Sequence, residues 1–289
     1  MNYTGGKYKL LNQILPYFPK KINRFFDLFC GGCNIGVNVK ANEIICNDIQ
    51  NEVIELMNYF KKNSSKQIIE EIENIIHKYE LSETSKYGYD YYGCNSNNGV
   101  AKYNKERYIK LRNDYNKSNR IPIMFYTVLI FAFNNQIRFN RQHEYKESVN
   151  KRDFNDNMRK NLIKFVDYIK NINIIFTNKD FRYLFTEKLN YNDFVYLDPP
   201  YLITSANYNK NWTEEHELNL LKLIDRLNDN GIRFALSNVL KHKGKANIIL
   251  QKWCEKYIVN DLMFNYQNCN YGTINRNPDS SKEVLITNY

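Results

Sequence analysis

The segment Asp198–Tyr201 has the composition of a site that activates an amino group. It reads Asp-Pro-Pro-Tyr and follows the apolar run Phe194–Leu197, which we predict to be a buried strand. An amino group conjugated to an aromatic ring is a poor nucleophile, because its lone pair is delocalised. The Asp198 carboxylate and the Pro199 carbonyl can accept its two hydrogens, and the Tyr201 ring offers a stacking face. We therefore predict these three residues to be catalytic; the alternative is a proline-stiffened strand exit.

A second candidate site is the glycine-rich turn that follows the apolar run Arg24–Phe29. Glycine at Gly31 lets the backbone approach a ligand closely. Asp48 lies about twenty residues further on, at the end of a second apolar run, where an acid suits a ribose diol. Asp27 would repel a pyrophosphate but could hold the ammonium of a methionine moiety. Since the glycine spacing is not G-x-G-x-x-G, the segment favours S-adenosylmethionine over a dinucleotide.

The six cysteines are too scattered for the disulfide framework of a secreted domain. Cys30 and Cys33 form a C-x-x-C pair, for which a zinc or redox centre is the alternative interpretation. None of the four histidines is suitably spaced to complete a zinc site, and the two glycines between the cysteines suit a ligand-binding turn. We therefore expect no metal.

Charge and hydropathy bound the function only loosely. The chain has 289 residues and a formal net charge of +10, which favours polyanionic partners. Lys, Asn, Ile and Tyr are abundant, however, as in proteins from AT-rich genomes, so the charge alone is weak support for nucleic acid. No apolar run approaches the roughly 20 residues of a membrane span, and no secretory signal begins the sequence. We expect a cytoplasmic protein.

Short apolar runs alternate with helical patterns along much of the chain, which predicts an α/β fold. The sheet should be mainly parallel, with helices on both faces, as in Rossmann-like folds. The predicted strands are Arg24–Phe29, Glu43–Asn47, Asn173–Thr177, Phe194–Leu197, Ile232–Ser237, Ile258–Phe264 and Glu283–Thr287. The predicted helices between them are Lys9–Phe18, Asn51–Lys62, Asp156–Lys170, Glu214–Asn228 and Lys245–Lys256, with Thr213 as an N-cap.

A helical insert interrupts this alternation. Its predicted helices are Gln67–Leu81, Tyr103–Tyr115 and Ile121–Phe133, and Ser82–Val100 has the composition of an exposed loop. We therefore predict a catalytic domain formed by residues 1–56 and 157–289. Residues 57–156 would form a separate domain that recognises the target.

The order of four motifs resembles a known family. Tyr3–Lys7 (Tyr-Thr-Gly-Gly-Lys), the turn Phe29–Gly32, the pair Asn47–Asp48 and Asp198–Tyr201 are similar to those of the Dam-type (D12 class) DNA adenine methyltransferases. The similarity runs nearly end to end and is closest to the bacteriophage branch, also through Leu236–Val239. It implies a Rossmann-like methyltransferase sheet with an inserted recognition domain. It also implies methyl transfer from S-adenosylmethionine to the 6-amino group of an adenine flipped out of duplex DNA.

The resemblance extends the set of cofactor residues. Tyr3 and Lys7 match the N-terminal cofactor motif, Phe29 the turn under methionine, and Asp180 with Phe181 the element that holds the cofactor adenine. The predicted cofactor-binding residues are therefore Tyr3, Lys7, Asp27, Phe29, Gly31, Asp48, Asp180, Phe181 and Asp198.

DNA contacts are implied within the insert. The segment 131–141 resembles a hairpin that reads GATC, in which Phe133 would fill the space of the flipped base and Arg138 would read guanine. Gln136 departs from the apolar residue usual at this position, so the predicted target is GATC or a related short site. The predicted DNA-binding residues are Phe133, Asn134, Gln136, Arg138, Asn140, Lys151 and Arg152. The alternative for such a short Arg/aromatic run is a solvated face.

Other functions remain open at this point. The acceptor could be adenine in structured RNA, or the chain could be a DNA-binding relative without turnover. A nicotinamide oxidoreductase is a remote fourth hypothesis. A restriction endonuclease counterpart in the cell is a further partner that stays open at this point.

Overall fold

The computed structural model describes residues 6–204, 212–263 and 281–289. The chain divides into two compact units. The first, which we call the helical unit, contains Gln50–Asn173; the second, which we call the sheet unit, joins Lys7–Ile49 to Ile174–Tyr289. The predicted assignment of one part to catalysis and the other to DNA recognition stays a prediction. Across the described ranges, no helix has the length and apolar character that a membrane span requires.

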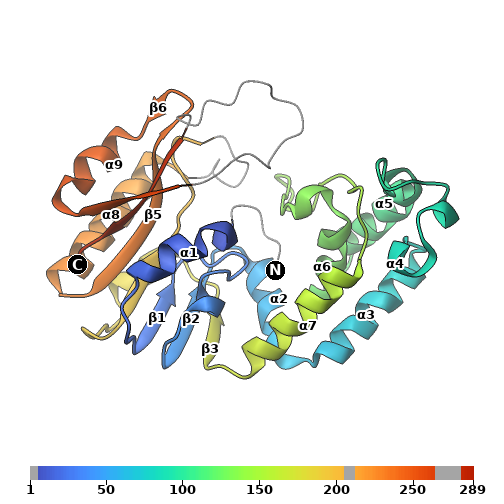
Figure 1. Cartoon of the computed structure of the whole chain (residues 1–289), viewed down its shortest axis with the longest axis horizontal. Helices are drawn as coiled ribbons and strands as arrows, with labels where there is room; N and C mark the ends of the chain where they lie inside the picture. The colour runs from blue at the N-terminus through green and yellow to red at the C-terminus, as the bar shows by residue number, and fades with distance from the viewer. Residues whose placement is uncertain (1–5, 205–211, 264–280) are drawn as a thin grey trace. The chain divides into compact units, whose positions relative to one another are not determined.

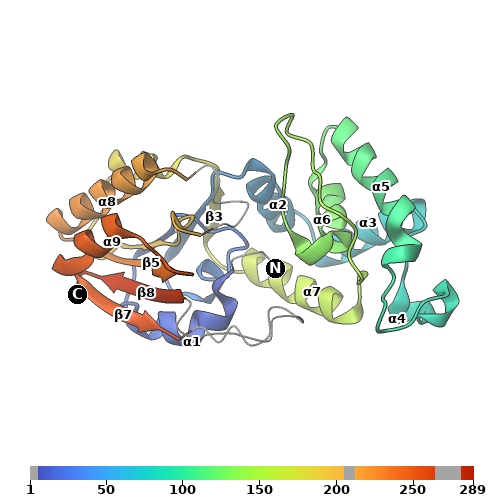
Figure 2. The same cartoon turned by 90° about the horizontal axis from the view of Figure 1, so that it is seen from above.

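The sheet unit is built on a mixed sheet of eight described strands (Figure 1). Strands β1 to β5 pair in parallel, whereas β8 is antiparallel to both of its neighbours, β5 and β7 (Figure 2). The predicted α/β fold with a mainly parallel sheet is confirmed. Along the sheet the order is β3 (Ile174–Thr177), β2 (Glu43–Asn47), β1 (Arg24–Asp27), β4 (Phe194–Leu197), β5 (Arg233–His242), β8 (Ser281–Thr287) and β7 (Ile258–Leu262), with β6 (Lys245–Ala246) paired to β5.

Helical segments of the sheet unit are mostly short. The longest is α8, whose N-cap Thr213 forms a capping box with His216, so the predicted N-cap is confirmed. The helical segments are η1 (Lys7–Leu10), α1 (Leu11–Ile14), η2 (Leu15–Tyr17), η3 (Gly36–Asn38), η6 (Phe181–Phe185), α8 (Glu214–Asp229), α9 (Ile248–Trp253) and η8 (Cys254–Lys256).

Two predicted helices differ from those observed. The helix predicted over Lys9–Phe18 is a series of 3-10 and α turns, because Pro16 removes a backbone donor at the start of η2. The helix predicted from Lys245 begins instead at Ile248. Lys245 pairs with His242 in the β5–β6 hairpin, so that prediction was wrong at its start.

Side chains point alternately to the two faces of the sheet along each strand, and both faces are buried. On one face the Phe18 ring packs on Phe25 and Phe194, with centroids 5.8 and 4.8 Å apart. On the other, Val195 and Leu197 join the apolar cluster that includes the buried leucines of α8. Every residue of β4 is buried, as its continuous apolar sequence predicts for a central parallel strand.

The helical unit is organised around α6. Eight of the ten residues of this helix are buried, and its uniformly apolar sequence predicts burial on all sides. It packs against α2, α3 and α5. The helical segments of this unit are α2 (Asn51–Lys62), α3 (Ser65–Lys78), α4 (Thr84–Tyr87), η4 (Asp90–Tyr92), α5 (Ala101–Lys117), α6 (Pro122–Phe131), η5 (Phe133–Asn135) and α7 (Asp156–Lys170).

The segment Ser82–Val100 is exposed over much of its length, as its polar composition predicts, but it is not entirely loop. It contains α4 and η4, and Ser82 and Val100 are fully buried. The buried carboxylate of Asp153 accepts hydrogen bonds from the Ser82 and Thr84 hydroxyls at 2.9 and 2.8 Å. The polar residues at the start of the segment are thus satisfied by an internal network, whereas Asn95–Asn98 are exposed.

Candidate functional site

Acidic residues follow four neighbouring parallel strands at one edge of the sheet. Asp27 ends β1, Asp48 follows β2, Asp180 lies three residues after β3, and Asp198 follows β4. Because parallel strands end at the same edge, their carboxyl ends form one ligand-binding border in open α/β sheets. All four acids were predicted from the sequence as site residues.

Backbone hydrogen bonds tie the loops of this border together. Leu28 N donates to Tyr196 O at 3.0 Å, and Cys30 N donates to Asn47 O at 2.8 Å. The buried Asn47 side chain donates to Leu28 O and Lys179 O, at 3.2 and 2.9 Å. Asn47 therefore joins the loops after β1 and β3, a bridging role that sequence analysis did not identify.

Gly31 and Asp48, both predicted cofactor residues, are in direct contact. Gly31 N donates to Asp48 Oδ2 at 2.8 Å, and the φ of Gly31 is +46°. A side chain at this φ would be strained, which is a physical reason for glycine here. The hydrogen bond fixes the carboxylate on the turn beside β1.

Asp27 is buried and lacks a basic partner among the described residues. Its Oδ2 accepts a hydrogen bond from Gly36 N at 3.1 Å, and no described lysine, arginine or histidine pairs with it. Burial, with smaller contributions from Cys33 and Asp198, raises the pKa of Asp27 well above its usual value. A cationic ligand group at this position would relieve that cost, so the site fits the ammonium or sulfonium of S-adenosylmethionine.

The structure adds Cys46 to the Cys30 and Cys33 pair that the sequence suggested. Cys33 Sγ lies 2.8 Å from Cys46 Sγ of β2, and both thiols are buried. Two thiolates on a tetrahedral zinc would be about 3.8 Å apart. Asp27 lies close enough to form a group of three possible metal ligands with them, but the two sulfurs are closer together than zinc thiolates would be. The expectation of no metal stays a prediction.

Three aromatic rings gather next to the glycine-rich turn. Phe29 and Phe181 have centroids 5.6 Å apart, and Trp212 lies 5.8 and 5.6 Å from them. Trp212 was not predicted; its place just before the N-cap of α8 gave only a weak signal. Asp180 is already engaged by Arg182, through Nε at 2.7 Å and Nη2 at 2.8 Å, which lowers its pKa. If Asp180 holds the cofactor adenine, it does so while its carboxylate is paired with Arg182.

Asp198 lies in a compact cluster of polar side chains, which we call the Asp198 cluster. Lys7 Nζ lies 2.8 Å from Asp198 Oδ1 and donates to the Tyr201 hydroxyl at 2.6 Å. Tyr201 in turn lies 3.0 Å from the same Oδ1 and 3.2 Å from Glu283 Oε1. The structure thus brings together three predicted residues and adds Glu283 on β8, which sequence analysis missed.

The cluster occupies only one oxygen of Asp198. Lys7 and Tyr201 both contact Oδ1, and no residue in the described part of the chain forms a hydrogen bond with Oδ2 or with the carbonyl of Pro199. The Asp198 side chain is 16% exposed. Two acceptors from consecutive residues therefore remain for a ligand after the end of β4, as the predicted activation of an amino group requires.

Residues 131–150 of the helical unit form a hairpin between α6 and α7, which we call the 131–150 hairpin (Figure 1). Phe133 N donates to Ser148 O at 2.8 Å, and Lys146 N donates to Arg138 O at 3.0 Å. At the tip, Asn140 N donates to Glu144 O at 2.9 Å. The predicted DNA-binding segment therefore occupies one arm of a real hairpin.

The predicted DNA residues on this hairpin differ in their surroundings. Phe133 is 47% exposed, and Asn134 has a left-handed φ of 51°. Arg138 is exposed, with Nη1 3.9 Å from Glu147 Oε1. The Asn140 side chain is held within the tip, since Nδ2 donates to Glu144 Oε2 at 2.7 Å. Phe133 and Arg138 are thus available to a ligand, whereas Asn140 shapes the turn.

Three further predicted DNA residues and one predicted cofactor residue, Tyr3, remain to be placed. Gln136 is half-buried, and its carbonyl accepts the hydroxyl of Tyr145. Lys151 and Arg152 are exposed just beyond the hairpin, and Lys151 O accepts Val100 N at 3.0 Å. Tyr3 lies outside the described residues.

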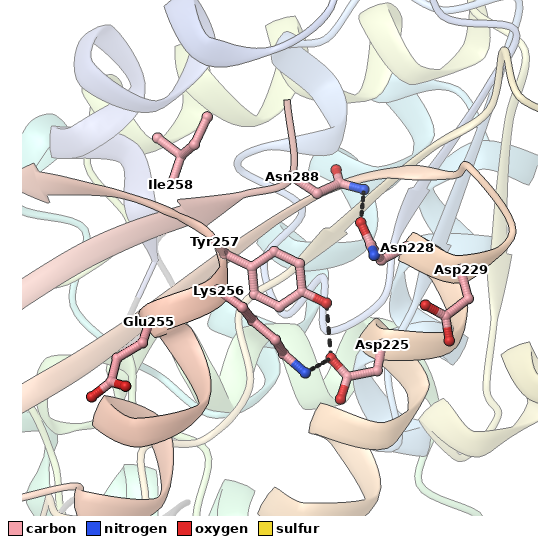
Figure 3. Close-up of a pocket in the computed structure, with 8 residues that line it drawn as sticks. All are labelled: Asp225, Asn228, Asp229, Glu255, Lys256, Tyr257, Ile258 and Asn288. Atoms are coloured by element: carbon pink, nitrogen blue, oxygen red, sulfur yellow. Dashed lines mark hydrogen bonds and ion pairs between the residues drawn. The ribbon is translucent and has the colours of Figure 1, made fainter.

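A surface pocket of about 560 Å³ lies elsewhere in the sheet unit (Figure 3). It is lined by the end of α8, by η8, by the start of β7 and by Asn288 just after β8. Its central acid, Asp225, is contacted by Lys256 and Tyr257, both at 2.8 Å. Because the strands start at this edge, the pocket is at the opposite end from Asp198, and its acid is already neutralised.

Comparison with protein families gives a match over residues 3–265 to the model of the D12 class N6 adenine-specific DNA methyltransferases. The chain is 40% identical to the type II methyltransferase M.FokI of Planomicrobium okeanokoites, over all of this chain and 42% of that protein. It is also 40% identical to the modification methylase StsI of Streptococcus sanguinis, over 100% of this chain and 42% of that protein. The chain therefore spans about two fifths of the length of these curated relatives.

A solved structure of a conserved hypothetical protein from Streptococcus pyogenes covers 98% of this chain and 96% of that one. It is 10% identical, and its TM-score of 0.35 is too low to support a statement about the fold. Nothing in these comparisons tests the resemblance to the bacteriophage branch.

Proposed function

Because the chain belongs to the D12 class of N6 adenine-specific DNA methyltransferases, we propose that it methylates the 6-amino group of adenine in duplex DNA, with S-adenosylmethionine as donor. The observation that carries this proposal is the Asp198 cluster. Its Lys7 and Tyr201 contacts hold Oδ1 and leave Oδ2 of Asp198 and the carbonyl of the following residue, Pro199, for a ligand. These two acceptors suit the two hydrogens of an aromatic amino group.

The cofactor would lie along the carboxyl edge of β1 to β3. Asp27 would face the methionine ammonium, and Asp48 would face the ribose. An aromatic part of the ligand would lie against the rings of Phe29, Phe181 and Trp212. When bound, S-adenosylmethionine supplies an electrophilic methyl group. Tyr3 belongs to the same proposed set.

The residues of the chain would make the amino nitrogen nucleophilic. Hydrogen bonds to Asp198 Oδ2 and Pro199 O draw the two hydrogens aside and localise the lone pair on nitrogen. Tyr201 and Lys7 hold the carboxylate in place throughout, so the acceptors need no rearrangement during the reaction.

Recognition of DNA is assigned to the 131–150 hairpin and the basic pair Lys151 and Arg152. Arg138 has the chemistry to form two hydrogen bonds to guanine, and the exposed Phe133 ring could fill the space of a flipped base. Extrusion of the base costs a few kcal/mol. GATC or a related short site is the proposed target, with Gln136 as the position where a departure from GATC is expected.

The relatives named above are type II and modification methylases, which supports a restriction endonuclease counterpart that reads the same site. This partner is part of the proposal.

The acceptor is tested with labelled methyl donor on duplex DNA and on structured RNA of matched sequence. We expect incorporation into duplex DNA as N6-methyladenine, and sequencing of genomic DNA with modified-base detection then gives the site. Label in RNA alone would replace the DNA proposal by the RNA alternative. Cofactor binding without incorporation into either acceptor would support the non-catalytic alternative.

A further inference from the structure

Glu283 is a buried acid whose position in the Asp198 cluster calls for a function. It belongs to β8, and its side chain is only 7% exposed. Its Oε1 lies 3.5 Å from Lys7 Nζ and 3.2 Å from the Tyr201 hydroxyl. A carboxylate is costly to bury, so its partners must compensate for lost hydration.

The cluster holds two carboxylates and one ammonium. Lys7 Nζ lies between Asp198 Oδ1 at 2.8 Å and Glu283 Oε1 at 3.5 Å. The Tyr201 hydroxyl has one proton and two carboxylate neighbours, so it can donate to only one of them at a time. Burial and both acids raise the pKa of Tyr201, which keeps this proton in place.

We propose that Glu283 is a positioning residue for the proposed methyl transfer. It fixes Lys7 and Tyr201 from the side of β8, so that these two groups hold Oδ1 of Asp198 and leave Oδ2 directed to the adenine amino group. The inference rests on the proposed function of the site.

The charge of Glu283 adds a second effect. During transfer the amino nitrogen bonds to the methyl carbon as the sulfur–carbon bond breaks; the bonding pair stays on sulfur, and nitrogen later loses one proton to solvent. The nitrogen therefore becomes more positive in the transition state. With both acids ionised, the cluster carries one net negative charge, which stabilises that change.

Protonation of Glu283 would remove both effects. Burial raises its pKa above the usual value, Lys7 opposes the shift and Asp198 adds to it. Within the described ranges, the titratable groups that face it are Lys7 from η1, Asp198 and Tyr201 from the loop after β4, and Tyr196 from β4. As the pH falls through this raised pKa, the turnover rate should decline.

The test uses Glu283→Gln in the full chain, with Asp261→Asn as matched control. Asp261 is an exposed acid of β7 that pairs with Lys282, so its change removes the same charge away from the cluster. We expect kcat of Glu283→Gln to fall about 10- to 100-fold, less than for a direct transition-state donor. The KM for DNA should change less than about 2-fold, and the acid limb due to Glu283 should disappear from the pH profile.

A readout independent of activity follows Lys7 by NMR of ¹³C-labelled lysine, with the signal assigned from Lys7→Arg. The Lys7 signal should shift in Glu283→Gln and stay unchanged in Asp261→Asn. A folded Glu283→Gln protein with wild-type kcat, pH profile and Lys7 signal overturns the inference.

This readout also separates the two proposals. If the wild-type protein methylates no adenine, the proposed function fails, while the Lys7 signal still reports whether Glu283 holds Lys7. Should Glu283→Gln fail to fold, Glu283→Asp replaces it, because it keeps the charge and shortens the reach. Its kcat should fall while the acid limb is retained, and unchanged kcat would overturn the inference.

Discussion

The ammonium of Lys7 lies 2.8 Å from the carboxylate of Asp198, although 190 residues separate them in sequence. Both side chains are largely buried, so the ion pair compensates part of the desolvation of each. The contact joins the N-terminal η1 to the loop after β4. The reactive end of the sheet is therefore completed by a residue from the start of the chain.

Lys7→Met should leave Asp198 and Glu283 buried with no cation between them. Breaking one partner of a buried pair costs about 3–5 kcal/mol, so the free energy of unfolding should fall by that order. Urea unfolding of the ligand-free protein measures it. Lys20→Met is the control, since Lys20 is exposed. Equal stability of both variants would show that the Lys7 contact is energetically minor.

Gly36→Ala should destabilise the sheet unit. A Cβ at Gly36 would lie 2.5 Å from Cys46 Sγ, 3.0 Å from Cys33 Sγ and 3.4 Å from Asp27 Oδ2. Overpacking of this kind costs about 1–3 kcal/mol, which thermal unfolding detects. Because Cys46→Ala removes the nearest atom, the double variant should lose less than the sum of the single variants. Strict additivity would contradict packing against Cys46.

Asp27→Asn should separate stability from cofactor binding. The folded-state pKa of Asp27 is raised above the usual 3.8, so its ionisation destabilises the ligand-free protein above that pKa. This loss of folding stability vanishes as the pH falls below 3.8. At neutral pH the variant should be at least as stable as the wild type without ligand, yet bind S-adenosylmethionine more weakly. Thermal shifts with and without cofactor test both parts.

An Asp27→Asn protein with full cofactor affinity would remove Asp27 from the proposed site. Asp261→Asn serves as the control for loss of one exposed negative charge.

Arg138→Ala should relax discrimination at one guanine by about 1–3 kcal/mol. The measurement is the Kd for duplexes that differ at single positions of the methylated site. Arg141→Ala, an exposed arginine at the tip of the same hairpin, is the control. If Arg138→Ala weakens all duplexes equally, Arg138 contacts phosphate instead.

Much of the reactive edge could be predicted from sequence because its signals are local. Asp198 and Asp48 directly follow apolar runs, and parallel strands bring such ends to one edge. Glu283 and Trp212 could not be found this way, because their roles depend on contacts with residues far along the chain. In the segment Ser82–Val100 the same limit hid α4 and η4, since Ser82 and Thr84 are held by Asp153, which lies far along the chain.

The central claim is that Asp198 activates the adenine amino group, and mass spectrometry of nucleosides from duplex DNA tests it most directly. The wild-type protein with S-adenosylmethionine should produce N6-methyladenine. Asp198→Ala should produce none, while cofactor and DNA binding stay largely intact. N6-methyladenine at the wild-type rate from Asp198→Ala would contradict the mechanism.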